Sequence, residues 1–165
     1  LSEYASLGFL IWVTLLLREI HMLSVNDLMT AIPYTVVADT PLRHVIELMK
    51  TEGCRQLPVL ADGILVGIVT DRDIRLVMNS PMVLHGHWQD EELLDRVTAG
   101  DCMTANPMTV GPDTPAYQAA RMLSIYKFGA LPVVDDGVLV GIITVTDYLD
   151  NFAAGQVENV VDGKL

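Results

Sequence analysis

Two Thr-x-x-Asp motifs, Thr70–Asp73 and Thr144–Asp147, carry the side chains best suited to chemistry in this chain. Each motif follows a β-type segment and opens a helical one, so the threonine lies at a helix N-terminus, where anions such as phosphate are favoured. The aspartate one turn later can accept hydrogen bonds from both hydroxyls of a ribose, and such charged hydrogen bonds contribute about 1.5–3 kcal/mol each. The same spacing also forms a capping box that serves only the helix. The motif therefore indicates either a helix cap or a ribosyl-phosphate site.

Other reactive groups lack the neighbours that catalysis needs. Asp71 and Asp73 are close in sequence, but no nucleophile or base accompanies them, and the phosphate-loop pattern GxxxxGK[ST] is absent. His85 and His87 resemble a metal-binding pair, yet two histidines that alternate in a linker are typical of solvent-exposed side chains. We therefore expect no enzyme activity, no catalytic residue and no metal site.

The overall composition restricts the class of protein. The chain has 165 residues, of which 51% are hydrophobic and 19% charged, and a formal net charge of −11 at pH 7. This hydrophobic fraction suffices for a packed core and argues against disorder. The acidity argues against nucleic acid and anionic lipid as partners, because both need a basic surface. Two cysteines without CxxC spacing, Cys54 and Cys102, fit a reducing compartment, so we expect a cytoplasmic protein.

An apolar run, Leu7–Leu17, distinguishes residues 1–22 from the rest of the chain. Its eleven residues are too few for a membrane-spanning helix, which needs about 20, and Glu3 stands where a signal peptide carries positive charge. Two interpretations remain open. The run is either a helix that buries its apolar face on the same or a neighbouring subunit, or part of a vector-derived leader that precedes a natural start at Met22. We assign no function to it.

The sequence contains an internal repeat at an offset of 74 residues. Asp27–Pro41 aligns without gaps with Asp101–Pro115, and Leu57–Asp73 aligns with Leu131–Asp147. Over Asp27–Asp73, 21 of the 47 aligned positions are identical. Self-similarity of this extent indicates a duplicated structural unit.

Both repeats predict the same order of elements. In the first, the expected elements are a helix after Asp39-Thr40-Pro41, a strand at Leu57–Leu60, a turn at Asp62-Gly63, a strand at Leu65–Val69 and a helix at Asp71–Val77. Asp or Thr followed by Pro is typical of a helix start, and Asp-Gly is typical of a tight β-hairpin. Each half is therefore a β-α-β-β-α unit of about 50 residues, a size at which one core alone is marginal.

Two such units can pack sheet to sheet with pseudo-twofold symmetry, which gives an α/β (α+β) fold. We expect five segments. They are an N-terminal apolar segment at residues 1–22, a first repeat at 23–82, a linker at 83–96 with a short helix at Asp90–Val97, a second repeat at 97–155, and a C-terminal tail at 156–165.

The two repeats resemble a tandem pair of CBS domains, also called a Bateman module. The residues that carry the resemblance in the first repeat are Met29-Thr30-x-x-Pro33, Asp39-Thr40-Pro41, Leu57-Pro58-Val59, Gly67-Ile68-Val69-Thr70 and Asp73. Their copies are Met103-Thr104-x-x-Pro107, Asp113-Thr114-Pro115, Leu131-Pro132-Val133, Gly141-Ile142-Ile143-Thr144 and Asp147. Five motifs in register, twice over, form a specific pattern, and it covers about residues 24–153.

The resemblance implies two ligand clefts between the repeats. In similar pairs, each cleft takes its Thr-x-x-Asp motif from one repeat and its base-binding wall from the other. Cleft 1 would then comprise Thr70, Asp73 and Ile68 with Met103, Asn106, Met108, Phe128 and Gly129. Cleft 2 would comprise Thr144, Asp147 and Ile142 with Thr30, Ile32, Tyr34, Cys54 and Arg55. The alternative for the wall side chains is ordinary core packing.

Basic residues distinguish the two clefts. Arg55 precedes the strand at Leu57, at a position where related modules carry residues that contact phosphate, whereas its copy is Gly129. Arg72 precedes Asp73, whereas Thr146 precedes the second aspartate. We therefore expect cleft 2 to take a phosphorylated ligand and Arg72 to assist in cleft 1. A solvated surface charge is the alternative for both arginines.

The resemblance implies a regulatory module that binds adenosine-containing ligands, namely AMP, ADP, ATP or S-adenosylmethionine, and requires no cofactor. Ligand binding would shift the population of conformations, and the regulated protein is unknown. The resemblance also implies a homodimer of pairs, in which helix residues Ile46, Leu48, Met49, Met122 and Ile125 would meet. The alternative is a scaffold for dimerisation or interaction whose clefts stay empty.

Overall fold

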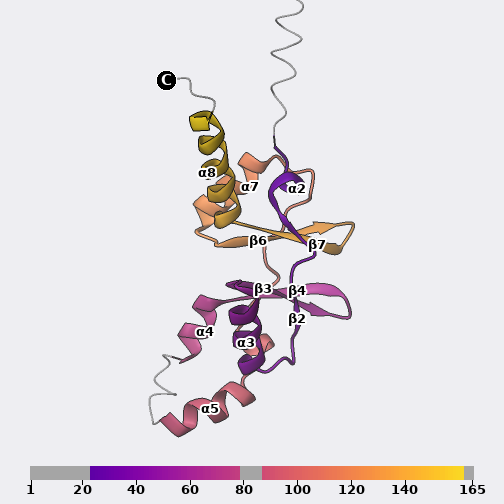
Figure 1. Cartoon of the computed structure of the whole chain (residues 1–165). Helices are drawn as coiled ribbons and strands as arrows, with labels where there is room; N and C mark the ends of the chain where they lie inside the picture. Colours follow the sequence, from indigo (N-terminus) through magenta and orange to yellow (C-terminus); the bar gives the residue numbers. More distant parts are fainter. Residues whose placement is uncertain (1–22, 79–86, 162–165) are drawn as a thin grey trace, which may run out of the picture.

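The computed structural model describes residues 23–78 and 87–161, which form two β-sheets stacked face to face with helices on their outer sides (Figure 1). This arrangement confirms the predicted α+β fold of two similar halves. The apolar run at Leu7–Leu17 and His85 of the histidine pair lie outside the described residues.

Each sheet is built mainly from one repeat and is completed by a short strand of the other. The first sheet has the order β2 (Val36–Val37), β3 (Gln56–Ala61), β4 (Ile64–Thr70), β5 (Thr104–Ala105). The second has the order β1 (Thr30–Ala31), β7 (Val138–Thr144), β6 (Ala130–Asp135). Only the β2–β3 pair is parallel, and the other strand pairs are antiparallel. The expected first strand of the second repeat is reduced to one bridge, Val110 to Val133.

The exchanged strands explain the Met-Thr and Gly-Ile motifs. Met103 precedes β5 and packs over Gly67 of β4, where an added Cβ atom would lie 2.2 Å from the methionine sulfur. Met29 does the same over Gly141 of β7, at 2.3 Å. A Cβ atom at either glycine would displace the methionine, so the two glycines allow each Met-Thr motif to pack closely on the strand of the other repeat.

The helices cover the outer faces of the sheets. The first sheet carries α3 (Leu42–Glu52), α4 (Asp71–Met78) and α6 (Ala99–Cys102), and α5 (His87–Arg96) packs against α3 farther from the sheet. The second sheet carries α2 (Val25–Leu28), α7 (Ala116–Tyr126) and α8 (Val145–Val161). Helix α5 is the helix expected in the linker, and it begins three residues before Asp90. Helix α8 continues to Val161 and so extends into the segment expected as the C-terminal tail. No helix within residues 23–78 and 87–161 is both long and apolar enough to cross a membrane.

The two outer cores use the same positions with different side chains. Leu42, Val45 and Met49 are the buried residues of α3, and Ala116, Ala119 and Leu123 are those of α7. The smaller residues of α7 are compensated by Tyr148 of α8, which packs on the second core and donates a hydrogen bond to the Ala116 carbonyl at 2.7 Å. Its copy in the first repeat is Ile74. The two halves therefore reach the same shape with different distributions of volume.

A small third core joins the two sheets. It consists of Ile68 of β4, Ala130 of β6 and Ile142 of β7, all buried. The hairpins that deliver these strands turn at Asp62-Gly63 and Asp136-Gly137, where all four residues have positive φ, as the predicted tight turns require. The space on either side of this inner core is where the clefts lie.

Most of the helix residues proposed for a dimer contact are already used within the chain. Met49 is buried in the first core, Ile46 and Leu48 pack partly against it, and Met122 packs partly against the second. Ile125, in contrast, is 58% exposed. Their helical spacing arises mainly from packing inside each repeat, because the same stripe faces the sheet beneath it.

Candidate ligand-binding clefts

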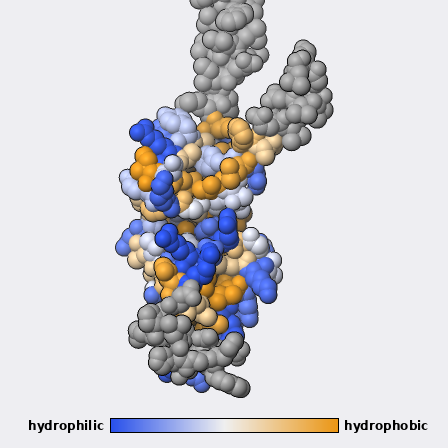
Figure 2. Space-filling view, turned by 90° about the vertical axis from the view of Figure 1, so that its left-hand side faces the viewer, coloured by the Kyte–Doolittle hydropathy of each residue, from blue (hydrophilic) through white to orange (hydrophobic). Residues whose placement is uncertain are grey.

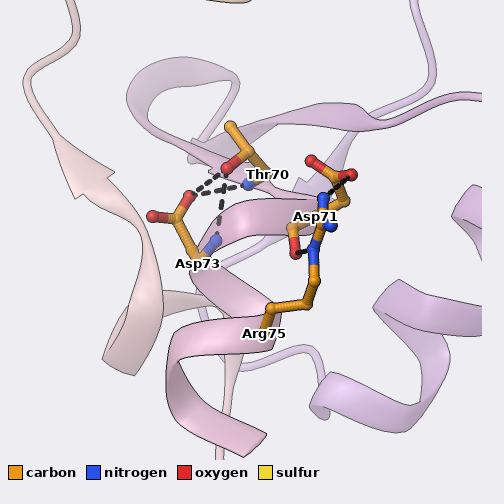
Figure 3. Close-up of polar contacts among 4 residues, drawn as sticks. All are labelled: Thr70, Asp71, Asp73 and Arg75. Atoms are coloured by element: carbon orange, nitrogen blue, oxygen red, sulfur yellow. Dashed lines mark hydrogen bonds and ion pairs between the residues drawn. The ribbon is translucent and has the colours of Figure 1, made fainter. Parts of the chain in front are cut away.

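The first Thr-x-x-Asp motif forms a complete capping box at the start of α4 (Figure 3). The Thr70 amide donates to Asp73 Oδ2 at 2.9 Å, and the Thr70 hydroxyl lies 2.7 Å from the same oxygen. The Asp73 amide donates to Thr70 Oγ1 at 3.3 Å. Asp71 and Arg75, in the same helix, form an ion pair on the adjacent side.

The second motif has the same geometry at the start of α8. The Thr144 amide and hydroxyl lie 2.6 and 2.8 Å from Asp147 Oδ2, and the Asp147 amide donates to Thr144 Oγ1 at 3.3 Å. Among the described residues, no hydrogen bond reaches Oδ1 of either Asp73 or Asp147. One carboxylate oxygen thus serves the helix, while the other remains available to a ligand.

The capping box alone does not mark a ligand site. Ser24 with Asp27 and Thr98 with Asp101 form the same box at the starts of α2 and α6. Both aspartates are exposed, and neither lines a cleft described below. Hydrogen bonds from Thr98 lower the pKa of Asp101 below its usual value. What distinguishes Asp73 and Asp147 is therefore their position between the two sheets.

Cleft 1 is a cavity of about 450 Å³ that brings together most of its predicted residues. Those that line it are Ile68, Thr70, Arg72, Asp73, Asn106, Met108, Phe128 and Gly129. Met103 is not among them, because its side chain packs over Gly67 in the first core. Leu76, Thr104, Pro107, Lys127 and Ala130 complete the lining. Thr104 and Pro107 are copies of Thr30 and Pro33, so a strict use of the 74-residue offset would have identified Thr104.

Cleft 2 is a cavity of about 310 Å³, and all of its predicted residues line it. These are Thr30, Ile32, Tyr34, Cys54, Arg55, Ile142, Thr144 and Asp147. The residues that sequence reasoning missed are Pro33, Glu52, Gly53, Gln56, Leu57 and Thr146. Glu52 ends α3, and no motif points to it. Its proximity follows only from the turn at Gly53, which is left-handed with φ of 65°.

Strained backbone lies at equivalent points of the two walls. Ile32 in cleft 2 and Asn106 in cleft 1 have φ of 50° and 49°. Asn adopts this left-handed conformation readily, but a β-branched residue does so at a cost. Each amide is fixed by a hydrogen bond across the crossing strand, to Val140 for Ile32 and to Val66 for Asn106. Ile32 is also 90% exposed, so a strained apolar side chain is held at the rim of cleft 2.

The walls differ in their titratable groups. The Glu52 carboxylate raises the pKa of Tyr34, mainly through a side-chain hydrogen bond. Burial raises the pKa of the half-buried Cys54 thiol, so this group is protonated at neutral pH. In cleft 1 the aromatic ring of Phe128 stacks on Tyr126 with centroids 5.5 Å apart. Cleft 2 therefore presents a phenol next to a carboxylate and a neutral thiol, and cleft 1 presents the ring of Phe128, which stacks on Tyr126 outside the lining.

No metal centre is found in the part of the chain that the structure describes. Within residues 23–78 and 87–161, no three His, Cys, Asp or Glu side chains converge in the way a metal ion needs. The polar groups of the clefts are suited to hydrogen-bond donors and to anions.

Known proteins resemble this chain over most of its length. The family model of the CBS domain matches residues 25–80 and 99–154. A CBS domain-containing protein of Dictyostelium discoideum is 34% identical over 128 residues, an alignment that covers 76% of this chain and 88% of the relative.

Two solved structures share the fold. The structure of CBSX2 from Arabidopsis thaliana in complex with AMP has a TM-score of 0.66 and 32% identity, and the match covers 82% of this chain and 98% of that one. The CBS domain pair of MJ0100, in complex with 5′-methylthioadenosine and S-adenosyl-L-methionine, has a TM-score of 0.68 and 26% identity over 81% of this chain and 98% of that one. With two matched domains and the fold of a CBS pair, this chain belongs to the CBS domain family, as a tandem pair.

Proposed function

We propose that this CBS pair is a regulatory module that binds adenosine-containing ligands, AMP, ADP or ATP, in clefts 1 and 2. One observation carries the proposal. Both Thr-x-x-Asp boxes that lie between the sheets open onto a cavity whose wall comes from the other repeat. The two solved structures described above, which share this fold, hold AMP in one case and 5′-methylthioadenosine with S-adenosyl-L-methionine in the other.

The free Oδ1 atoms of Asp73 and Asp147 give the clefts a preference for ribose. Each carboxylate already accepts two hydrogen bonds from its threonine on Oδ2, which fixes its orientation. A fixed carboxylate accepts hydroxyl hydrogen bonds without a further loss of side-chain freedom. A ligand with two neighbouring hydroxyls therefore gains more than one with a single hydroxyl.

The apolar parts of the walls suit a flat purine ring. Ile68 in cleft 1 and Ile142 in cleft 2 form the floors, and both are buried between the sheets. Phe128 and Tyr34 are 37% and 54% exposed and offer ring faces to a ligand. Stacking on either ring would remove apolar surface from water.

Binding would act on conformation because each cleft joins both repeats. A ligand in cleft 1 touches α4 and the 106–108 wall, and a ligand in cleft 2 touches α8 and the 30–34 wall. It stabilises whichever arrangement of the repeats closes around it, by its difference in affinity for the two states.

Calorimetric titration tests this proposal directly. Protein shown to be free of co-purified nucleotide is titrated with AMP, ADP, ATP and S-adenosylmethionine, with GTP as the control. We expect micromolar binding of at least one adenosine-containing ligand and none of GTP. If no adenosine-containing ligand binds at several temperatures, the proposal is wrong, and a scaffold with empty clefts becomes the better description.

A further inference from the structure

A groove lined by arginines lies between clefts 1 and 2. It is a cavity of about 560 Å³ that contains the side chains of Arg55, Arg72 and Arg75, and we call it the arginine groove. Arg75 forms an ion pair with Asp71. Among the described residues, no ion pair involves Arg55 or Arg72. Figure 2 shows hydrophilic side chains gathered at the level where the two halves meet, between more apolar surfaces.

The arginine groove is continuous with both clefts. Thr70 and Arg72 line the groove and cleft 1, and Arg55 and Thr144 line the groove and cleft 2. Because both threonines stand at helix N-termini that face this space, an anionic group next to either one is favoured. A phosphate chain on a nucleotide in either cleft therefore extends into the same groove.

The cations of the groove come from one repeat only. At the offset of 74 residues, the copies of Arg55, Arg72 and Arg75 are Gly129, Thr146 and Leu149, all uncharged. The pseudo-twofold axis thus relates two ligand clefts but does not duplicate the arginines, and Lys127 of the second repeat lines cleft 1 and not the groove. Two phosphate chains would have to share one set of guanidinium groups.

We infer that the arginine groove holds the polyphosphate of one nucleotide at a time, so that ATP bound in one cleft weakens the binding of ATP in the other. This inference rests on the proposed function. One triphosphate can neutralise the two arginines that lack an ion pair. A second triphosphate would then be repelled by the negative charge of the first. Two AMP molecules, each with a short phosphate close to its own helix N-terminus, fit together.

Stoichiometry measured by calorimetry tests this inference. We expect two AMP molecules to bind per chain, but only one ATP, with a second ATP bound at least tenfold more weakly. The variant Thr146→Arg adds one cation to the second repeat, and it should strengthen the binding of the second ATP at least tenfold. Thr146→Gln introduces a longer polar side chain without the charge, and it should leave the binding of the second ATP weak. Arg96→Gln, on α5 away from the clefts, should change neither ligand.

The outcomes separate this inference from the proposed function. Two equivalent ATP molecules per chain, together with two AMP molecules, would overturn the shared groove and leave the nucleotide sensor intact. A single AMP per chain would overturn it as well, because one cleft would then be closed to every nucleotide regardless of phosphate charge. Absence of binding by any adenosine-containing ligand would overturn the proposed function and this inference with it.

Discussion

Clefts 1 and 2 have the same ribose-facing box but different walls. Thr70–Asp73 and Thr144–Asp147 agree to within 0.3 Å in all three hydrogen bonds. Opposite them, cleft 1 presents Phe128 and Lys127, whereas the corresponding residues of cleft 2 are Cys54 and Gly53. The box is constrained because it also caps a helix. Gly53 and Lys127 also end helices, α3 and α7, but they do so through a left-handed backbone, so the side chain at this point of the wall can differ between the repeats.

The largest effect is expected from removing one carboxylate. Asp147→Ala should weaken AMP in cleft 2 by at least about 1.5 kcal/mol, a little over tenfold, because a hydrogen bond to a charged group is lost. In calorimetry one of the two AMP sites should be weakened by this amount, and Asp73→Ala should weaken the other.

Asp101→Ala provides the matched control for both carboxylate variants. It breaks the same type of capping box and should lower the free energy of unfolding by about 1 kcal/mol. Both AMP sites should remain. Equal losses of AMP affinity in all three variants would show that the boxes serve folding alone.

Removal of the Arg55 charge should show which cleft binds the phosphate group of AMP. Arg55→Ala should weaken AMP by about 1–2 kcal/mol, roughly tenfold, while adenosine changes less than about twofold, because adenosine lacks the group that the guanidinium contacts. Only one of the two sites should respond. Titrations of AMP and adenosine measure the difference, and equal losses for both ligands would assign Arg55 to packing.

Much of this arrangement could be predicted from the sequence, since the repeat fixes which residues are equivalent. The hairpin at Asp62-Gly63 and the helix after Pro41 follow from motifs, and more than half of the residues that line the two clefts follow from the motifs together with the family resemblance. The role of Met103 did not, because its contact with Gly67 depends on a strand crossing between repeats that no local pattern encodes. Glu52 was missed for a similar reason, since it reaches cleft 2 only through the left-handed turn that ends α3.

A substitution that relieves the backbone strain at Ile32 should affect the stability of the fold and the binding of AMP in cleft 2 in different ways. Ile32→Gly removes a β-branched residue from a left-handed conformation, so the free energy of unfolding should stay level or rise by up to about 1 kcal/mol. AMP affinity should fall a few-fold, because the apolar rim is lost. Asn106→Gly is the matched variant in cleft 1 and should change both quantities less. Denaturant unfolding and calorimetry measure the two effects, and a clear loss of stability for Ile32→Gly would contradict the strain argument.

The smallest effect concerns the thiols, and it reports on cleft 2 alone. Burial raises the pKa of Cys54, and it raises that of Cys102 to about 11. The thiolate is the reactive form, so alkylation of both cysteines should be slow at pH 7 and should accelerate as the pH rises towards their raised pKa values. Both cysteines pack against the first core, but of the two only Cys54 lines cleft 2. AMP should therefore slow the alkylation of Cys54 several-fold and leave Cys102 unchanged, as mass spectrometry of the labelled peptides would show. Equal protection of both cysteines would indicate a general tightening of the fold, and no protection of Cys54 would place AMP in cleft 1 only.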